Sequence, residues 1–570
     1  MSRKLLERLQ QEFGTAILRT ADQHGDAVIW VAPKDATVVL RHLRDREQCE
    51  LLLDVAGVDY PERAKRFEVN YLLRSLARAH RVRVKIDVAE GEAVESATPL
   101  WRCADWHERE VFDLLGVPFR GHPDLRRILC HHEFEGHALR KDYPIEQGQP
   151  CVSTEKLFGD HEIEQASRRS EGVAAAGDES GLPSDLLTVN IGPSHPATHG
   201  ALRVEVLLDG ETVVRARSEI GYLHRCFEKE AEDHTWHEVM PYTDRLNYCS
   251  ALLNNAIWAH SVEKLLGVQI TPRCRAIRVI VSELARLTDH LVCLAANLVD
   301  IGALTNYWYL YNVREGIYQI FDKLCGSRLT TNYARIGGMS HDLYPGFAEE
   351  TLFHLGRLDE AIRDVTGLVA RNRIFLDRTV GVGAISREEA LSWGYTGPCL
   401  RATGLAYDVR RFAPYFGYEE YDFDIPVGEH GDTYDRIMVR FEEMKQSARI
   451  IRQALRKLPE GPVNIDDPRV ILPPKESVYG SIEGMMNQFK LIYEGIQVPA
   501  GEAYGFGEGG NGELGFFCVS NGTGRPWRVK VRPPCFPIFS SYSRLIEGGM
   551  IPDAIAILGS LNIIAGELDR

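Results

Sequence analysis

Hydrophobic and polar positions follow both the strand period and the helix period in the first part of the chain. Residues 81–88, RVRVKIDV, alternate charged and apolar side chains and predict a half-buried strand, and residues 67–73 predict another. The apolar spacing of residues 35–45 and 97–116 is that of helices, and Gly116 is well placed to end the second one. Residues 1–146 are therefore expected to form a small α/β domain.

The pattern changes after this domain. Residues 147–185 are polar and poor in aromatic side chains, which predicts a linker with a short helix near 160–169. Two alternating runs around Asp209 and Gly210 then predict a β-hairpin. Long helical patterns dominate residues 235–457, and glycine-rich strand-like segments return between 496 and 537. The expected class is α+β: a small α/β domain, then a mainly helical domain over 186–570 with an N-terminal β-hairpin and β-rich C-terminal segments.

Composition narrows the classes of function. The formal charge of −15 argues against a nucleic-acid-binding protein, which would present a basic face. No apolar run reaches the roughly 20 residues that cross a bilayer; residues 291–311 come nearest, and Asn297, Asp300 and Asn306 interrupt them. The N-terminus lacks the apolar segment of a signal peptide, so we expect a chain that folds in the cytoplasm and can dock on a membrane protein. The 12 cysteines include no C-x-x-C pair, which disfavours a disulfide framework or a four-cysteine metal site.

The segment NIGPSHPATHG, residues 190–200, holds two histidines four positions apart, His195 and His199. Zinc binding at this spacing requires one helix face, and Pro193 and Pro196 oppose a long helix. An exposed loop is therefore the simplest interpretation of the segment alone. Because the loop leads into the predicted hairpin, it could instead hold a histidine rigidly in a cleft, with a proton donor and a carboxylate as partners.

Two later residues have the chemistry of such partners. Tyr248 lies near the start of a predicted helix, and Asp300 ends a helix that is otherwise apolar. A buried carboxylate in that position is costly unless it is paired. The structural alternatives stay open at this point, because Asp300 could cap a helix and Tyr248 could be ordinary core.

Several motifs together resemble one known family. GPSHPATHGALRVEVLLDGE, IGYLHRCFEK, MPYTDRLNY, NLVDIGALT, GYTGPCLRATG and the terminal GSLNIIAGELDR resemble the 49-kDa-type D subunit of respiratory complex I, over residues 186–570. The first domain, through ADWHEREVFDLLGVPFRGHPDLRRIL and HALRKDYP, resembles the 30-kDa-type C subunit of the same enzyme. The chain is thus similar to the fused C/D subunits of bacterial NADH-quinone oxidoreductases.

This resemblance implies a hydrogenase-large-subunit-like fold and a role in quinone reduction. In the family, the D subunit and the B subunit form the cavity where quinone receives electrons from the last [4Fe-4S] cluster, which the B subunit holds. Matched motif by motif, His199 and Tyr248 would hold the quinone headgroup and Asp300 would pair with the histidine. Arg225 and Arg245 match arginines that lie beside that cluster, where a positive charge stabilises its reduced form.

The resemblance also implies partners, location and an enzyme class. It implies a proton-translocating NADH:quinone oxidoreductase of the respiratory chain, with B-, H- and I-type subunits and the membrane arm as partners and a G-type subunit as a further candidate. The chain would bind no metal or cofactor alone and no nucleic acid, and would lie peripherally on the cytoplasmic side of the bacterial inner membrane. For the C-like domain we expect an assembly role without chemistry, its charged ERE and GHPDLRRIL segments contacting the D-like domain and its neighbours.

Two other functions compete with this one. A membrane-bound nickel–iron hydrogenase needs four thiolates from two C-x-x-C motifs, and this chain has one cysteine at each corresponding place, Cys226 and Cys535, which disfavours that function. In a purely structural scaffold, His199 and Tyr248 could be replaced without harm. Several positions depart from the family: Thr330 stands where a titratable histidine is frequent, Asn511 where lysine is usual and Cys226 where glycine is common, and the segment GMMNQFK lacks the family's paired histidines.

Overall fold

The computed structural model describes residues 2–149 and 186–570. In the N-terminal part, five strands form one sheet in the order β1-β2-β5-β4-β3, in which only β2 and β5 are parallel. These strands are β1 Ile17–Gln23, β2 Asp26–Val31, β3 Leu51–Asp59, β4 Phe67–Ser75 and β5 His80–Val88. Three helices accompany the sheet: α1 Ser2–Phe13, α2 Ala36–Asp45 and α3 Ala104–Leu115. Gly116 ends α3 in the left-handed region with φ 80°, as the sequence predicted.

The prediction that residues 81–88 form a half-buried strand was wrong in one respect. The strand is present as β5, but both of its faces are covered, and Arg83 and Lys85 are each only 2% exposed. The Lys85 ammonium lies 2.7 Å from a carboxylate oxygen of Glu68 and 2.7 Å from one of Glu502. Because Glu502 belongs to the C-terminal part of the chain, local alternation could not reveal that the charged face of β5 is buried.

The C-terminal part begins with the predicted hairpin. Its strands are β9 Arg203–Asp209 and β10 Thr212–Glu219, and Gly210 turns between them with φ 60°. A further strand, β8 Leu187–Ile191, pairs with β9 and completes a three-stranded sheet, an addition that the alternation did not predict.

Long helices form the body of this part, as predicted for residues 235–457. They are α8 Ala251–Leu266, α9 Pro272–Asp300, α10 Leu304–Cys325, α11 Phe347–Val369 and α16 Thr433–Arg456. The longest, α9, packs against α8, α10 and α16 and is buried along most of its length. The Thr271 hydroxyl caps its first turn, and Pro272 occupies a position where the missing N–H costs nothing.

Shorter helices connect these elements, and a second sheet follows them. The short helices include α6 Phe227–Asp233, α7 Met240–Thr243, α12 Arg373–Thr379, α13 Arg387–Ser392, α14 Gly397–Arg401, α15 Val409–Phe412, α17 Lys475–Gly480 and α18 Ile482–Tyr493. The sheet consists of β13 Gly501–Glu508, β14 Glu513–Ser520 and β15 Arg528–Arg532, as the strand-like segments predicted. The chain ends in α19 Cys535–Ser540, α20 Tyr542–Ile546, α21 Ile551–Leu561 and α22 Ala565–Asp569.

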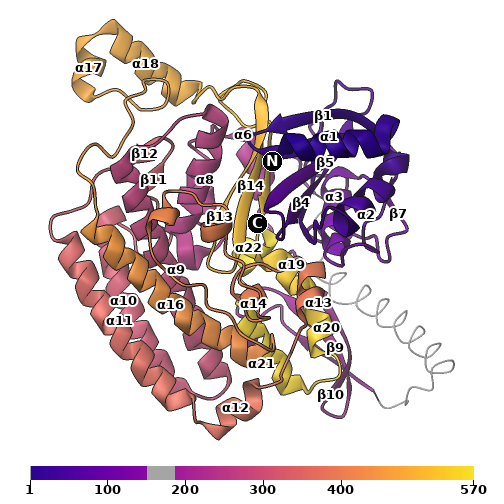
Figure 1. Ribbon diagram of the computed structural model, residues 1–570, viewed down its shortest axis with the longest axis vertical. Helices are drawn as coiled ribbons and strands as arrows, with labels where there is room; N and C mark the ends of the chain where they lie inside the picture. Colours follow the sequence, from indigo (N-terminus) through magenta and orange to yellow (C-terminus); the bar gives the residue numbers. More distant parts are fainter. Residues whose placement is uncertain (1, 150–185) are drawn as a thin grey trace.

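The N-terminal part lies against the β13–β15 sheet, on the side opposite the long helices (Figure 1). Arg528 and Arg532 of β15 donate hydrogen bonds to the carbonyl oxygens of Gly57 and Leu53 in β3, at 2.9 and 3.2 Å. This confirms the α+β class and the order of its parts. The boundaries at 146/147 and 185/186 remain predictions, because the segment 150–185, with its expected helix near 160–169, falls outside the described residues.

Within residues 2–149 and 186–570, no helix combines the length and the apolar character that crossing a lipid bilayer requires.

Candidate functional site

His199 and Asp300 meet at the junction of the hairpin loop and the longest helix. His199 follows the short 3₁₀ helix Pro196–Thr198 with φ 53°, and Asp300 is the last residue of α9. The His199 Nε2 atom lies 2.7 Å from Asp300 Oδ2, and the side chains are 25% and 16% exposed. The ring N–H is not aligned for a hydrogen bond to this oxygen, and the contact is an ion pair only when the imidazole is protonated. The structure thus brings together two of the sequence-predicted residues, separated by a hundred positions.

His195 shapes the loop that presents His199. Its Nδ1 atom accepts a hydrogen bond from the backbone N–H of Ala197 at 3.2 Å and so caps the 3₁₀ helix. The Thr198 hydroxyl donates to the carbonyl oxygens of His195 and Gly200, at 2.6 and 2.7 Å. These bonds fix the backbone on both sides of His199.

Tyr248 begins a second short 3₁₀ helix, Tyr248–Ser250, which leads directly into α8. Its ring is partly buried against the hydrophobic core. Burial raises the pKa of Tyr248 to about 12, and the neighbouring Cys249 and Cys535 thiols act in the same direction. The phenol therefore keeps its proton at neutral pH and can donate a hydrogen bond.

The C-terminal helix α22 lies against both the His199 loop and the Tyr248 segment. A Cβ atom at Gly200 would stand 2.7 Å from the Cβ atom of Ala565, and one at Gly566 would stand 2.6 Å from the carbonyl oxygen of Arg245. Both approaches are too close for a larger residue. The terminal helix therefore holds the loop and the tyrosine segment in one region of the molecule.

Arg225 and Arg245 lie beside each other in this region. The Arg225 guanidinium donates to the carbonyl oxygens of Arg245 and Gly566, at 2.8 and 2.9 Å, and burial lowers its pKa. Half of the Arg245 side chain is exposed, and its guanidinium lies 3.5 Å from the buried Asp244 carboxylate. Burial raises the pKa of Asp244 to about 6. The two arginines thus present positive charge at the surface near Tyr248.

A buried polar cluster behind Tyr248 was missed by the sequence reasoning. The Asp289 carboxylate accepts hydrogen bonds from Asn247 at 3.2 Å and from Asn562 at 3.1 Å. The Asn562 amide also donates to Asn511 Oδ1, and the Asn511 amide in turn donates to the Cys535 thiol at 3.4 Å. Asn511, which stands where the family usually has lysine, was the one signal of this cluster in the sequence. The residues that it joins there come from four separate segments of the chain.

Glu567 completes this polar cluster. Its Oε1 accepts a hydrogen bond from the backbone N–H of Cys535 at 3.2 Å. Burial raises the pKa of Glu567 to about 7, and the nearby Asp289 carboxylate contributes in the same direction. A buried carboxyl group that titrates near neutral pH therefore lies in the polar cluster that borders Tyr248.

The two cysteines at the places of the hydrogenase motifs have different neighbours. Cys226 precedes α6 beside His224, whereas Cys535 begins α19 beside Asn511. Among the described residues, one group of three side chains has metal-ligand geometry: Asp54, His107 and Glu110. The Lys530 ammonium lies 3.4 Å from the Asp54 carboxylate and 2.9 Å from that of Glu110, so a protein cation already occupies this position.

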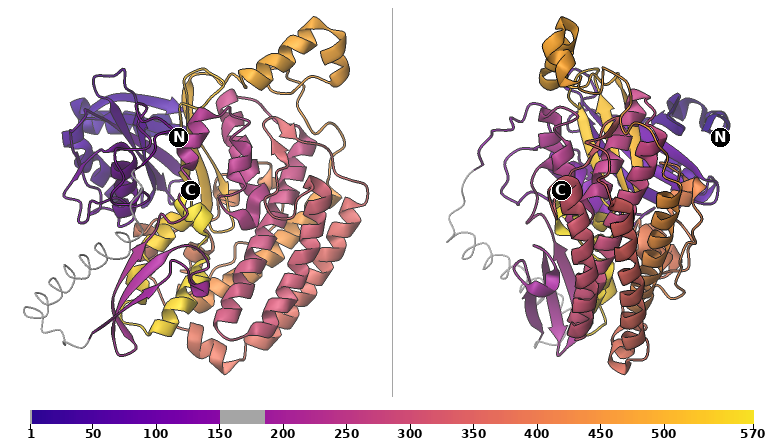
Figure 2. Two further views of the ribbon diagram at one scale, coloured as in Figure 1. Left: turned by 180° about the vertical axis from the view of Figure 1, so that it is seen from behind. Right: turned by 90° about the vertical axis from the view of Figure 1, so that its left-hand side faces the viewer.

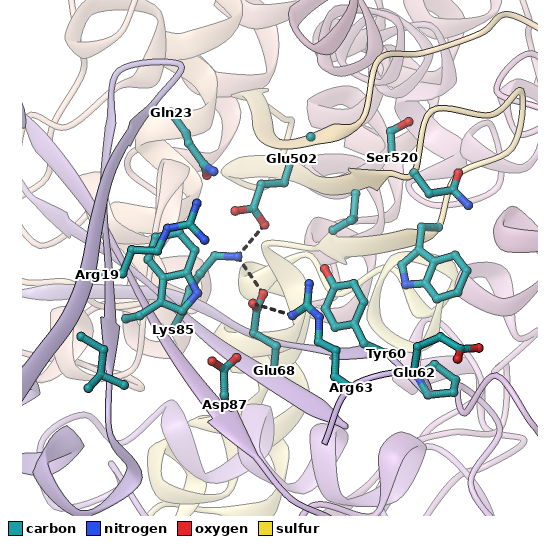
Figure 3. Close-up of a pocket in the computed structure, with 17 residues that line it drawn as sticks. Arg19, Gln23, Tyr60, Glu62, Arg63, Glu68, Lys85, Asp87, Glu502 and Ser520 are labelled. Atoms are coloured by element: carbon teal, nitrogen blue, oxygen red, sulfur yellow. Dashed lines mark hydrogen bonds and ion pairs between the residues drawn. The ribbon is translucent and has the colours of Figure 1, made fainter. Parts of the chain in front are cut away.

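A cavity of about 750 Å³ lies elsewhere, between the N-terminal part and β13–β14. Figure 3 shows Lys85 in it between Glu68 and Glu502, with Arg63 near Tyr60. The Arg63 guanidinium stacks on the Tyr60 ring at 3.4 Å from its centroid and lies 3.5 Å from Glu68. Lys85 and Arg63 are thus already paired with carboxylates of the protein, and neither His199 nor Tyr248 lines this cavity.

Comparison with known proteins gives matches over both parts of the chain. The 49-kDa subunit family of respiratory-chain NADH dehydrogenase matches residues 300–570, and the 30-kDa subunit family matches residues 29–149. The NADH-quinone oxidoreductase C/D subunit of Bdellovibrio bacteriovorus is 48% identical over 551 residues, covering 96% of this chain and 95% of the relative.

Two further relatives extend the comparison. The NADH-quinone oxidoreductase C/D subunit of Acidiphilium cryptum is 38% identical over 566 residues, covering 97% of this chain and 95% of the relative. A D-type NADH-quinone oxidoreductase subunit of Sorangium cellulosum is 52% identical over 393 residues, covering 69% of this chain and 97% of the relative. The chain therefore belongs to the family of fused NADH-quinone oxidoreductase C/D subunits and is one subunit of the respiratory complex I assembly.

Proposed function

We propose that this chain forms, with a B-type subunit, the cavity in which quinone is reduced, and that His199 and Tyr248 bind the quinone headgroup. The observation that carries the proposal is the 2.7 Å approach of His199 Nε2 to Asp300 Oδ2, in which both side chains remain partly exposed. A histidine held by a carboxylate at an exposed loop can offer its proton to a ligand.

The reaction explains why these residue types are required. Reduction of a quinone to a quinol consumes two electrons and two protons, and each carbonyl oxygen gains negative charge before it is protonated. The imidazolium of His199 would donate to one oxygen and the Tyr248 phenol to the other. The high pKa of Tyr248 makes its O–H a hydrogen-bond donor throughout the neutral range.

Asp300 acts through His199 as a positioning residue. Its carboxylate stabilises the imidazolium before proton donation and is left without its cationic partner afterwards. The change in charge would occur at the end of α9, a helix that is buried over most of its length. We infer that this event is a first step by which quinone reduction is coupled to proton translocation.

The proposal assigns the electron donor to the partner subunit. A [4Fe-4S] cluster in the B-type subunit would supply the electrons, and Arg225 and Arg245 would lie beside it on the surface of this chain. Their positive charge would stabilise the additional electron of the reduced cluster. The chain itself would bind no cofactor.

The proposed assembly extends beyond the B-type subunit. H- and I-type subunits and the membrane arm would be further neighbours, with a G-type subunit as an additional candidate, on the cytoplasmic side of the bacterial inner membrane. NADH would be the electron donor of the whole assembly, and proton translocation would belong to the assembly rather than to this chain.

The test uses the assembled oxidoreductase with H199A or Y248F in this chain. We expect NADH:quinone activity to fall about 100-fold, the usual effect of removing a positioned proton donor. NADH oxidation by an artificial acceptor such as hexacyanoferrate should stay unchanged, since it bypasses the quinone. Y242F is the matched control, because Tyr242 lies six residues from Tyr248 and contacts His234.

Two outcomes would contradict the proposal. If both variants reduce quinone at the parental rate while the assembly stays intact, the site is wrong and the chain is a scaffold at this position. If Y242F loses as much quinone activity as Y248F, the segment matters for its structure and not for the Tyr248 hydroxyl.

A further inference from the structure

Another cavity, of about 710 Å³, lies between the N-terminal part and the β8–β10 sheet. Its walls come from α3, from residues 126–132 and from all three strands of that sheet. Figure 2 shows the sheet, in purple, on the same side of the molecule as the indigo N-terminal part. The two walls touch, because a Cβ atom at Gly221 would stand 2.4 Å from the carbonyl oxygen of Leu129. Both described parts of the chain therefore build this cavity, and neither His199 nor Tyr248 lines it.

Arginine side chains dominate the lining of this cavity. Five of them line it: Arg109, Arg126, Arg127, Arg203 and Arg217. Glu219 is the one carboxylate among the described residues of the lining, whereas the cavity at Lys85 is lined by four carboxylates and three cationic side chains. Arg109 and Arg126 belong to the ERE and GHPDLRRIL segments, for which the sequence predicted an assembly role without chemistry. The charge of this lining indicates an anionic ligand.

Arg109 is the buried cation of the lining, with 4% of the residue exposed. Its guanidinium donates to the backbone carbonyl oxygens of Arg126 and Arg127, at 3.2 and 2.9 Å, and forms no ion pair with a carboxylate among the described residues. The Asp105 carboxylate, one helical turn away on α3, instead lies 3.2 Å from His122. Burial lowers the pKa of Arg109 to about 10. A buried charge without a counter-ion is costly, so an anion in the cavity beside Arg109 is favoured.

Two further guanidinium groups lie near Arg109, one on each wall. Burial is the largest cause of the lowered pKa of Arg109, and the charges of Arg126 and Arg217 add to it. Arg126 Nε lies 2.7 Å from the Asp124 carboxylate, which is outside the lining, and Arg217 Nε lies 3.7 Å from Glu219. Burial acts to raise the pKa of Asp124, but its hydrogen bond with Arg126 and the charges of all three guanidinium groups hold it below the ordinary value. Three arginines from α3, the 126–132 segment and β10 therefore gather in one place, where two carboxylates accompany them.

A phosphate group matches this arrangement better than a single carboxylate does. It carries close to two negative charges at neutral pH and three acceptor oxygens, and arginine recognises it through paired N–H groups. Ile128, Leu129 and Ile220 supply an apolar part of the lining, which suits the organic part of a phosphate ester. The volume of the cavity lies within the range of about 300–1,000 Å³ that is usual for small-molecule sites.

We propose that this cavity binds a phosphate ester, with Arg109, Arg126 and Arg217 around the phosphate group. Because both parts of the chain supply these arginines, the bound ligand links the N-terminal part to the β8–β10 sheet. Pro193, in the loop that holds His199, lines the same cavity. The site is separate from the quinone chemistry, and its existence does not depend on the proposed function.

The experiment titrates the full chain and the assembled oxidoreductase with phenyl phosphate at neutral pH, by calorimetry, with inorganic phosphate as a second probe. We expect phenyl phosphate to bind in both samples, and more tightly than inorganic phosphate because of the apolar part of the lining. R126Q and R217Q should each weaken its binding about 10-fold, since each removes a charge-assisted hydrogen bond. R109K should also weaken it, because lysine keeps the charge but lacks the planar fork. R215Q is the matched control and should bind like the parent, because Arg215 is exposed on β10 and does not line the cavity.

Vesicles that contain phosphatidic acid distinguish a lipid from a soluble source of the phosphate group. If the full chain binds these vesicles with the same dependence on Arg126 and Arg217, but does not bind phenyl phosphate, the ligand is a lipid headgroup. If neither probe binds, the proposal is wrong.

Two further outcomes would overturn the site. One is that R126Q and R217Q bind phenyl phosphate no more weakly than R215Q, because binding then follows the total charge. The other is binding by the full chain but not by the assembled oxidoreductase, because a neighbouring subunit then fills the cavity. R126Q and R217Q keep the test decisive if R109K folds poorly, since their native side chains are 34% and 40% exposed. H199A should bind phenyl phosphate like the parent, so that failure of the quinone proposal leaves this one standing.

Discussion

Two regions of this protein place carboxylates against cations in opposite surroundings. At the boundary of the N- and C-terminal parts, Lys530, Glu110 and Arg570 are each at most 2% exposed. The Lys530 ammonium lies among the carboxylates of Glu110, Asp54 and Glu228, at 2.9, 3.4 and 3.8 Å. In the candidate site, one histidine and one aspartate meet with exposures of 25% and 16%.

The difference indicates which charged groups stabilise the fold and which are available for chemistry. A fully buried network allows no member to change its charge without leaving another uncompensated. A partly exposed pair can lose a proton at lower cost, because water screens the remaining charge. The boundary is thus suited to holding two parts together, and the His199–Asp300 pair to proton transfer.

The largest expected effect comes from breaking the boundary network. K530A would leave Asp54, Glu110 and Glu228 buried without this cation, and removing one partner of such a network costs about 3–5 kcal/mol. We expect a lower midpoint of thermal or denaturant unfolding for the purified chain. R120A is the control, since Arg120 pairs with Glu95 at 3.1 Å with side chains 73% and 43% exposed. An equal loss of stability in K530A and R120A would show that the buried network contributes no more to stability than an exposed ion pair.

The second prediction concerns Glu567, which is buried like the boundary residues but lies in the polar cluster bordering Tyr248. Its pKa is raised from 4.5 to about 7, so the folded chain keeps a proton that the unfolded chain has lost. This contribution to stability is fully present below pH 4.5 and is lost as the pH rises towards 7. The change is about 1.4 kcal/mol per pH unit, or about 3 kcal/mol over the range.

E567Q tests this dependence, because an amide does not titrate. The free energy of unfolding of the variant should fall less between pH 4.5 and 7 than that of the parent. E483Q changes an exposed glutamate and should leave the parental slope unaltered. A parental slope in E567Q would show that Glu567 ionises normally and that another group in the polar cluster holds the proton.

The sequence predicted those parts of the fold that depend on local periodicity. The hairpin around Gly210, the long helices and the C-terminal strands all appear where the pattern placed them. The burial of β5 did not follow from its pattern, because Lys85 is covered by Glu502, more than four hundred residues later in the chain. Whether charged residues are buried depends on their tertiary partners, and the alternation of polar and apolar residues along one strand carries no information about those partners.

The candidate site was reached by a different route. The residue types alone left two interpretations open, a functional histidine with a carboxylate partner or an exposed loop and a helix cap, and only the family resemblance favoured the pairing of His199 with Asp300. The structure places them in contact, whereas the cluster of Asp289, Asn511, Asn562 and Glu567 was not foreseen. Its members come from distant segments, and no spacing in the sequence connects them.

The third prediction concerns the partly exposed pair, His199 and Asp300. D300N removes the charge that positions His199, and we expect NADH:quinone activity of the assembled enzyme to fall about tenfold, equivalent to about 1.4 kcal/mol. The stability of the purified chain should change by less than about 1 kcal/mol, because the pair is partly solvated. Proton translocation per quinone reduced, measured in proteoliposomes, should fall further than the rate. A loss of stability as large as that of K530A would show that Asp300 is structural.

The smallest effect concerns backbone strain next to the site. Cys226 adjoins Arg225 and adopts φ 57°, a left-handed conformation that glycine enters without cost and other residues enter at about 1 kcal/mol. In contrast, Glu110 and Lys530 lie within the regular elements α3 and β15. C226G should therefore raise the unfolding free energy of the purified chain by about 1 kcal/mol. C274G, at a buried position inside α9, should lower it, because glycine there adds backbone freedom to the unfolded chain. If the C226G chain is no more stable than the parent, the contact of the Cys226 thiol with His224 compensates the strain. The backbone next to the site is then no more strained than the backbone at Glu110 and Lys530.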